Sequence, residues 1–182
     1  MDLVKKSKYL SKLLRHKPED AGLIMEDDGW VELAQLISNT ELSLPLIDDI
    51  VGQNDKQRFE FNADKTKIRA RQGHSVKVDL AYDEVQPPDV LYHGTAKSKF
   101  FFIWKDGLLK MGRQHVHLSL TEEAAIKVGQ RHGEPLVLHV NTGEMYACGF
   151  KFYHTDNDVW LTDHVPYYYL FVIADGKIRM VI

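Results

Sequence analysis

The chain has 182 residues, of which 44% are hydrophobic and 27% charged, a composition typical of one globular domain or two small lobes. No apolar run approaches the roughly 18 residues that a membrane-spanning helix needs, and "MDLVKKSKYL" lacks the apolar segment of a secretory signal. Cys148 is the only cysteine, which excludes an internal disulfide and a thiolate zinc site. We therefore expect a cytoplasmic protein that does not associate with a membrane.

The net charge of −3 conceals a strong segregation of charge along the chain. Residues 1–17 hold six Lys or Arg and one acid, and residues 18–55 hold ten Asp or Glu and no Lys or Arg. Residues 56–77 again hold seven Lys or Arg against two acids. The two basic segments could form one phosphate-attracting surface, or they could be separate solvated faces; counting leaves both interpretations open.

The first part of the chain predicts three helices. Residues 2–15 carry leucines at helical spacing, and Pro18 predicts the end of this helix because it has no N–H to donate. A turn at Gly29 and a short amphipathic helix are predicted within residues 27–39, and another helix within residues 44–53.

Residues 58–71 alternate in polarity around a turn at 62–65, which predicts a β-hairpin. Three helices followed by a hairpin form a winged-helix-like arrangement, which is common in nucleic-acid binders, although a fold alone does not establish function. The Pro87-Pro88 pair is the clearest interruption in the succession of predicted helices and strands. We place a lobe boundary there, with an N-terminal lobe at 1–86 and a C-terminal lobe at 87–182.

The C-terminal lobe is predicted to be mixed and rich in strands, so the fold class is α+β. The predicted strands share β-branched and aromatic residues and lie at 90–95, 115–120, 135–140, 150–155, 159–162 and 167–173. Helices are predicted near 100–110 and within 121–133, the second with Thr121 at its start and Gly133 just past its end.

Several familiar motifs are absent from the sequence, among them the dinucleotide-binding G-x-G-x-x-G, the Walker A loop, the G-x-S-x-G elbow and the H-E-x-x-H zinc helix. His115 and His117 would share one face of a strand and could begin a metal site. No cysteine and no obvious third ligand is near them, so we expect no metal.

Four separated segments combine Arg, His and Gly. They are "LLRHKPE" at 13–19, "IRARQGHS" at 68–75, "LYHGT" at 91–95 and "HVHLSLTEEAAIKVGQRHG" at 115–133. Each alone has an ordinary explanation, such as a helix cap or a turn after a strand. In this order and spacing, together with "NDVWLTDHV", they resemble the NAD-dependent RNA 2′-phosphotransferase family over about residues 7–170. Arg71 and the tail at 171–182 have no counterpart in this resemblance.

The resemblance implies a winged-helix-like RNA-binding lobe joined to an ADP-ribosyltransferase-like lobe that binds NAD, with the active site in the cleft between them. It implies that a 2′-phosphate on tRNA-like RNA attacks C1″ of NAD and expels nicotinamide. The ribose 2″-hydroxyl then attacks phosphorus, which yields 2′-OH RNA and ADP-ribose 1″,2″-cyclic phosphate. NAD would thus be a co-substrate, and we expect a monomer.

By similarity, the catalytic residues are Arg15, His16, Arg69 and Arg131. The first three would grip the 2′-phosphate, and His16 could also act as a donor or general acid. Arg131 would stabilise the transesterification step. Arginine suits both tasks because the nucleophile is already an anion, which needs positioning and charge neutralisation rather than a general base.

The resemblance assigns NAD to the C-terminal lobe, where His93, Gly94 and Thr95 follow one strand and His117 and Ser119 alternate on another. Two other interpretations remain open. One is an ADP-ribosyltransferase that acts on another acceptor, such as a terminal phosphate of RNA or DNA. The other is an RNA-binding module whose second lobe has decayed, although binding alone would not need the four catalytic residues.

Overall fold

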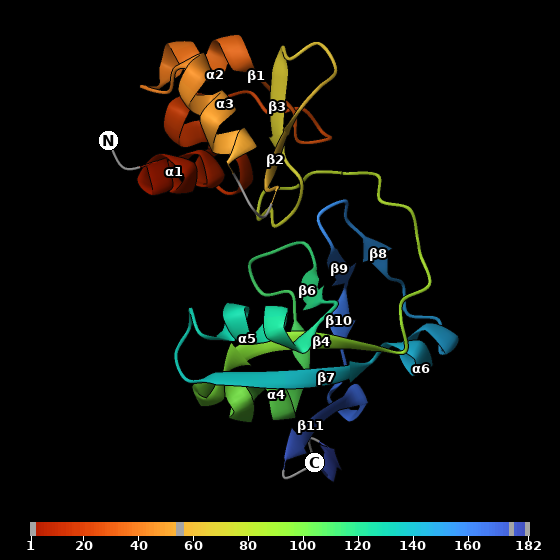
Figure 1. Ribbon diagram of the computed structural model, residues 1–182. Coiled ribbons are helices and arrows are strands. Elements are labelled where there is room, and N and C mark those ends of the chain that lie inside the picture. The colour runs from red at the N-terminus through yellow and green to blue at the C-terminus, as the bar shows by residue number, and fades with distance from the viewer. Residues whose placement is uncertain (1–2, 54–56, 175–176, 181–182) are drawn as a thin grey trace. The chain divides into compact units, whose positions relative to one another are not determined.

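The computed structural model describes residues 3–53, 57–174 and 177–180. The chain forms two compact units, Met1–Ala81 and Tyr82–Ile182, here called unit 1 and unit 2 (Figure 1). The division falls shortly before the Pro87-Pro88 pair, which lies in unit 2. In the described ranges, no helix has the length and apolar character needed to cross a membrane.

In its described residues, unit 1 consists of three α-helices, one short 3-10 helix and a three-stranded antiparallel sheet. In chain order these are α1 (Leu3–Arg15), η1 (Pro18–Ala21), β1 (Val31–Glu32), α2 (Leu33–Asn39), α3 (Leu44–Gly52), β2 (Phe59–Phe61) and β3 (Lys67–Ala70). The strand order is β1-β3-β2. The predicted helices and hairpin are therefore present.

The core of unit 1 explains why α1 and the hairpin form. α1 buries Leu10, Leu13 and Leu14 completely, and these side chains pack with residues of α2, α3, β2 and β3. In the hairpin, the side-chain oxygen of Asn62 accepts a hydrogen bond from the Lys67 N–H at 2.8 Å, which closes the predicted turn.

Unit 2 is built on a seven-stranded sheet with the order β12-β11-β7-β4-β6-β9-β8, and a two-stranded sheet pairs β10 with β5. The strands are β4 (Val90–Ala96), β5 (Leu108–Leu109), β6 (Val116–Ser119), β7 (Pro135–Asn141), β8 (Tyr153–His154), β9 (Val159–Thr162), β10 (His164–Val165), β11 (Leu170–Ala174) and β12 (Lys177–Met180). The helices are η2 (Lys97–Lys99), α4 (Phe100–Asp106), α5 (Glu122–Gly129), α6 (Thr142–Ala147) and η3 (Tyr167–Tyr169). Helix α5 packs against β4, β6 and β7.

Unit 2 agrees with the predicted α+β class but differs from the sequence-based expectations at several elements. Tyr167–Tyr169 form a 3-10 turn rather than a strand. The strand predicted over 150–155 is reduced to Tyr153–His154. Helix α5 starts as predicted, because the Thr121 hydroxyl accepts a hydrogen bond from the Ala124 N–H at 3.2 Å, but it ends at Gly129.

Candidate functional site

Three of the four expected catalytic residues come together in unit 1 around the imidazole of His74. Arg15 ends α1, His16 follows it, and Arg69 lies on β3. Burial, reinforced by the positive charges of Arg15, His16 and Arg69, lowers the pKa of His74 to about 4. His74 is therefore neutral near pH 7, and the charges that surround it are cationic.

A turn at residues 73–75 holds the end of α1 in place. The Ser75 N–H donates to the Arg15 carbonyl oxygen at 2.8 Å, and the Ser75 hydroxyl lies 2.9 Å from His16 Nδ1. Gly73 has φ +85°, a conformation that favours glycine, and the Arg15 guanidinium packs against it. The turn thus positions the backbone of Arg15 and the ring of His16 together.

Arg69 is held by contacts from three directions. Its Nε donates to Glu60 on β2 at 2.7 Å, its Nη1 donates to the Asp28 carbonyl oxygen at 3.2 Å, and its guanidinium carbon lies 4.4 Å from the Trp30 ring centroid. Arg71, which the resemblance left unexplained, forms an ion pair with the same Glu60 at 3.2 Å. Glu60 therefore fixes both arginines, Arg69 on β3 and Arg71 just after it.

His74 lies at the centre of this cluster, and no role for it is predicted from the sequence. Only 1% of it is exposed, and within the described part of the chain no group hydrogen-bonds either ring nitrogen. The Gly29 turn closes over it, since a Cβ at Gly29 would lie 3.6 Å from His74 Nε2. The only sign of a role for His74 in the sequence is its position inside the "IRARQGHS" segment. Its burial cannot be predicted from that segment, because it depends on contacts with residues distant in sequence.

In unit 2, the five residues expected to bind NAD lie on two neighbouring strands. β4 carries His93, Gly94 and Thr95, and its antiparallel partner β6 carries His117 and Ser119. His93 Nδ1 donates to the His117 carbonyl oxygen at 3.0 Å. Because this nitrogen carries the proton, Nε2 of the neutral ring remains an acceptor.

The surroundings of His93 keep it neutral. Burial is the main cause that lowers its pKa, and the positive charges of Arg113 and His132 lower it further. Arg113 Nη1 also lies 3.4 Å from His117 Nδ1. Arg113 was missed in the sequence, although it precedes the His115–His117 pair closely; unit 2 thus adds a cation beside the expected NAD residues.

Helix α5 approaches β4 so closely that two glycines are required. A Cβ at Gly94 would lie 1.8 Å from the Ala125 carbonyl oxygen, and a Cβ at Gly129 would lie 2.7 Å from the Thr95 carbonyl oxygen. Helix packing therefore explains why position 94 is glycine, whereas the resemblance had linked it to a dinucleotide. Contact of its backbone with NAD stays a prediction.

Arg131, the fourth expected catalytic residue, belongs to unit 2. It is exposed in the turn after α5, where its N–H donates to the Val128 carbonyl oxygen at 3.2 Å. In the residues that the structure describes, no group of three or more His, Cys, Asp or Glu side chains is arranged to hold a metal ion. The His115 ring instead packs against Tyr153, with 5.6 Å between centroids.

Comparison with known proteins places this chain in a family. Residues 1–164 match the family described as RNA 2′-phosphotransferase, Tpt1 / KptA. A probable RNA 2′-phosphotransferase of Flavobacterium johnsoniae is 50% identical over 169 residues, which cover 90% of this chain and 93% of that protein. One from Agrobacterium fabrum is 48% identical over 176 residues, 94% and 95% of the two chains. The chain belongs to the RNA 2′-phosphotransferase family.

Proposed function

We propose that this protein is a transferase that removes the 2′-phosphate from RNA by transferring it to NAD. Membership of the RNA 2′-phosphotransferase family supports the reaction class. The observation that carries the proposal is the cluster of Arg15, His16 and Arg69 around the neutral His74. Such a concentration of fixed donors, with a neutral imidazole at its centre, suits a phosphate dianion.

In this proposal, unit 1 binds the 2′-phosphate. Arg69 is oriented by Glu60 and Trp30, and His16 by Ser75, so little side-chain freedom is lost when phosphate binds. The phosphate needs no general base because it is already charged. Positioning and charge neutralisation by these donors are the catalytic contribution of unit 1 to the first step.

The residues of unit 2 fit NAD as the second substrate. His93 is neutral and offers Nε2 as an acceptor for a ribose hydroxyl, Ser119 offers a hydroxyl on the paired strand, and Arg113 supplies positive charge for a pyrophosphate. Gly94 and Thr95 would contribute backbone contacts, and His117 would complete the ribose side.

The proposed chemistry proceeds by two displacements. A 2′-phosphate oxygen attacks C1″ of the nicotinamide ribose, and the bond from C1″ to the ring nitrogen breaks to release nicotinamide. The ribose 2″-hydroxyl then attacks phosphorus, and the bond from phosphorus to the RNA 2′-oxygen breaks. The products are 2′-OH RNA and ADP-ribose 1″,2″-cyclic phosphate, and Arg131 would stabilise the oxygens that gain charge in this second step.

The test is to incubate the protein with a 2′-phosphorylated oligoribonucleotide, with and without NAD, and to analyse the products by mass spectrometry. We expect ADP-ribose 1″,2″-cyclic phosphate and 2′-OH RNA only when NAD is present. The proposal would be overturned if the protein formed neither product from this RNA but ADP-ribosylated a 5′- or 3′-terminal phosphate. That result would identify a different acceptor.

A further inference from the structure

All the charged side chains of α1 are cations. The helix carries Lys5, Lys6, Lys8, Lys12 and Arg15 and no acid. The N-terminal end of a helix is the positive end of its dipole, where carboxylates are favourable and lysines are not. Helix stability therefore does not explain three lysines in the first two turns, and another use for them has to be sought.

Four residues of α1 form one exposed stripe, which we call the α1 stripe: Lys5, Lys8, Tyr9 and Lys12. At 100° per residue, these positions and Arg15 fall within an arc of about 120°, opposite the buried leucines. The distance from Lys5 to Arg15 along the helix is about 15 Å at 1.5 Å per residue. The stripe thus leads directly to the end of α1 where the phosphate site is proposed.

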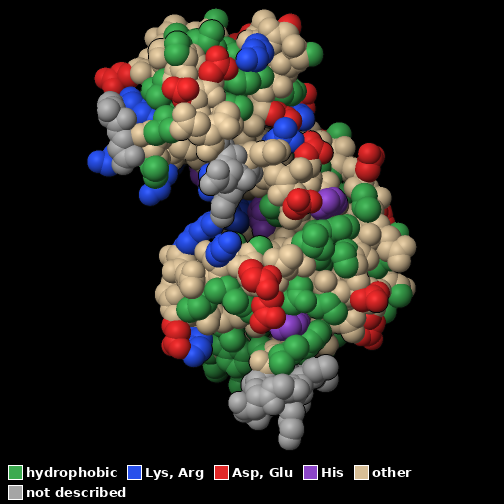
Figure 2. Space-filling model, viewed as in Figure 1, with side chains coloured by type: hydrophobic (Ala, Val, Ile, Leu, Met, Phe, Trp, Pro, Cys, Tyr) green, Lys and Arg blue, Asp and Glu red, His purple; other side chains and the backbone are tan. Residues whose placement is uncertain are grey.

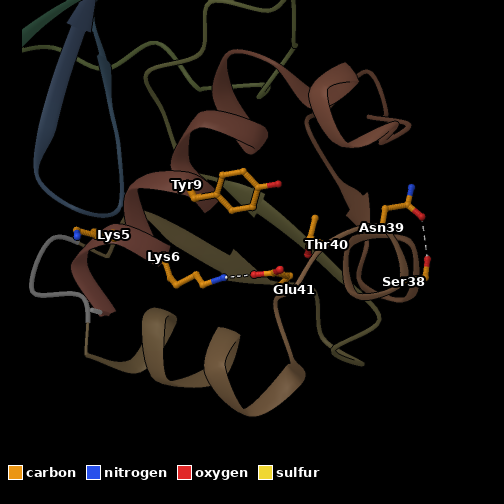
Figure 3. Close-up of a pocket in the computed structure, with 7 residues that line it drawn as sticks. All are labelled: Lys5, Lys6, Tyr9, Ser38, Asn39, Thr40 and Glu41. Carbon is orange, nitrogen blue, oxygen red and sulfur yellow. Dashed lines mark hydrogen bonds and ion pairs between the residues drawn. The ribbon is translucent and has the colours of Figure 1, made fainter. Parts of the chain in front are cut away.

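A hollow with a volume of 660 Å³ adjoins the first half of the stripe (Figure 3). Its lining consists of Lys5, Lys6 and Tyr9 from α1 together with the segment 38–41. Lys6 is nearly buried and paired with Glu41 at 3.3 Å, so it belongs to the wall of the hollow. Tyr9 is 37% exposed and presents one aromatic ring beside Lys5 and Lys8, two of the three exposed lysines of the stripe.

The other two α-helices described in unit 1 do not offer a comparable surface. α2 has no charged residue, and α3 has no cation but contains Asp48 and Asp49. Carboxylates on α3 repel a phosphate backbone, so α3 is unsuited to the groove-reading role of a second helix in helix-turn-helix proteins. Blue Lys and Arg side chains lie over α1 on the face of unit 1 shown in Figure 2.

We propose that the α1 stripe binds the RNA strand next to the phosphorylated nucleotide, which rests on the function proposed above. Backbone phosphates would lie on Lys5 and Lys8, and an unpaired base would stack on Tyr9. Lysines spaced along a groove with an exposed aromatic ring are the combination that binds single-stranded RNA without reading its sequence. Lys12 contributes less, because Asp20 forms an ion pair with it.

The test compares Lys5→Ala/Lys8→Ala with a control of equal charge loss, Lys99→Ala/Lys105→Ala, at two exposed lysines of unit 2. Affinity for a 12-nucleotide RNA without a 2′-phosphate is measured by fluorescence anisotropy across a salt series. We expect the slope of log K against log salt to fall in magnitude by about 1.4, since each contact with a single strand contributes about 0.7. Tyr9→Leu should weaken binding about tenfold, whereas Tyr9→Phe should not.

An unchanged salt slope and an unchanged RNA affinity in the Lys5→Ala/Lys8→Ala variant would overturn the inference. The inference would also be overturned if this variant lost binding to anionic vesicles but kept its affinity for RNA. Because this assay uses unphosphorylated RNA, it does not depend on catalysis. A wild-type protein that binds RNA through the stripe but forms no cyclic phosphate would refute the proposed function alone.

Discussion

The Nδ1 atom of His16 lies 2.9 Å from the hydroxyl oxygen of Ser75, 59 positions further along the chain. This hydrogen bond joins the residue after α1 to the turn after β3, and so connects two of the segments that resemble the family. Both groups are near the surface, so the bond contributes more to the orientation of the imidazole than to folding.

Replacing Ser75 with alanine should therefore lower turnover more than stability. We expect kcat for 2′-phosphate removal to fall about tenfold, which corresponds to a net hydrogen bond of roughly 1.4 kcal/mol, while the free energy of unfolding changes by less than about 1 kcal/mol. Ser75→Thr, which keeps the hydroxyl, and Ser98→Ala, at an exposed serine of unit 2, serve as controls. Wild-type kcat in Ser75→Ala would show that the bond does not orient His16 for the reaction.

The burial of His74 predicts a dependence of stability on pH. Its pKa is about 4 in the folded chain and near 6.5 when unfolded, so between these values the unfolded state binds a proton that the folded state does not. The contribution of this histidine to the free energy of unfolding is therefore complete above pH 6.5. It decreases as the pH falls from 6.5 toward 4, by about 3 kcal/mol in total.

The measurement is urea denaturation at pH 7.0 and 5.0 for the wild type, His74→Asn and His164→Asn. We expect the loss of unfolding free energy between the two pH values to be smaller in His74→Asn, whose side chain does not titrate. His164 is exposed, so its replacement should leave the wild-type difference intact. An equal pH dependence in all three proteins would contradict the assignment.

The contact between β4 and α5 predicts a severe effect at Gly94. An added methyl group would meet the Ala125 carbonyl oxygen, which belongs to the helix backbone and cannot rotate away. We expect Gly94→Ala to lower the free energy of unfolding by about 3 kcal/mol or more, at the upper end of overpacking effects. Gly112→Ala is the matched control, because among the described residues no heavy atom lies within 4 Å of the position that its methyl group would take. This variant should change the free energy of unfolding by less than about 0.5 kcal/mol.

Local sequence signals predicted most elements of unit 1. The leucine spacing of α1, the stop at Pro18 and the Asn62–Lys65 turn depend on interactions between near neighbours, and all are found. The less regular parts of unit 2 were not predictable in this way. α6 has only six residues, too few for a period to be visible, and Tyr167–Tyr169 have strand-like composition but form a 3-10 turn directly after Pro166.

The sequence indicates which residues of unit 1 are candidates for the site, but it does not predict the contacts between them. Two of the four segments contain Arg15, His16 and Arg69, yet nothing local shows that these residues surround one imidazole. The burial of His74 requires α1, the Gly29 turn and the 73–75 turn to meet, and the role of Glu60 requires the pairing of β2 with β3. Such contacts are set by tertiary packing and are not encoded in short-range patterns.

In the proposed reaction, cations of unit 1 hold the 2′-phosphate and Arg131 of unit 2 acts in the second displacement. The most direct measurement follows nicotinamide release and ADP-ribose 1″,2″-cyclic phosphate formation from one 2′-phosphorylated RNA, for the wild type and Arg131→Ala. We predict that the variant releases nicotinamide and accumulates RNA carrying ADP-ribose on its 2′-phosphate, with cyclic phosphate formation slowed at least about a hundredfold. Cyclic phosphate formation at the wild-type rate in Arg131→Ala would show that Arg131 does not act in the second displacement.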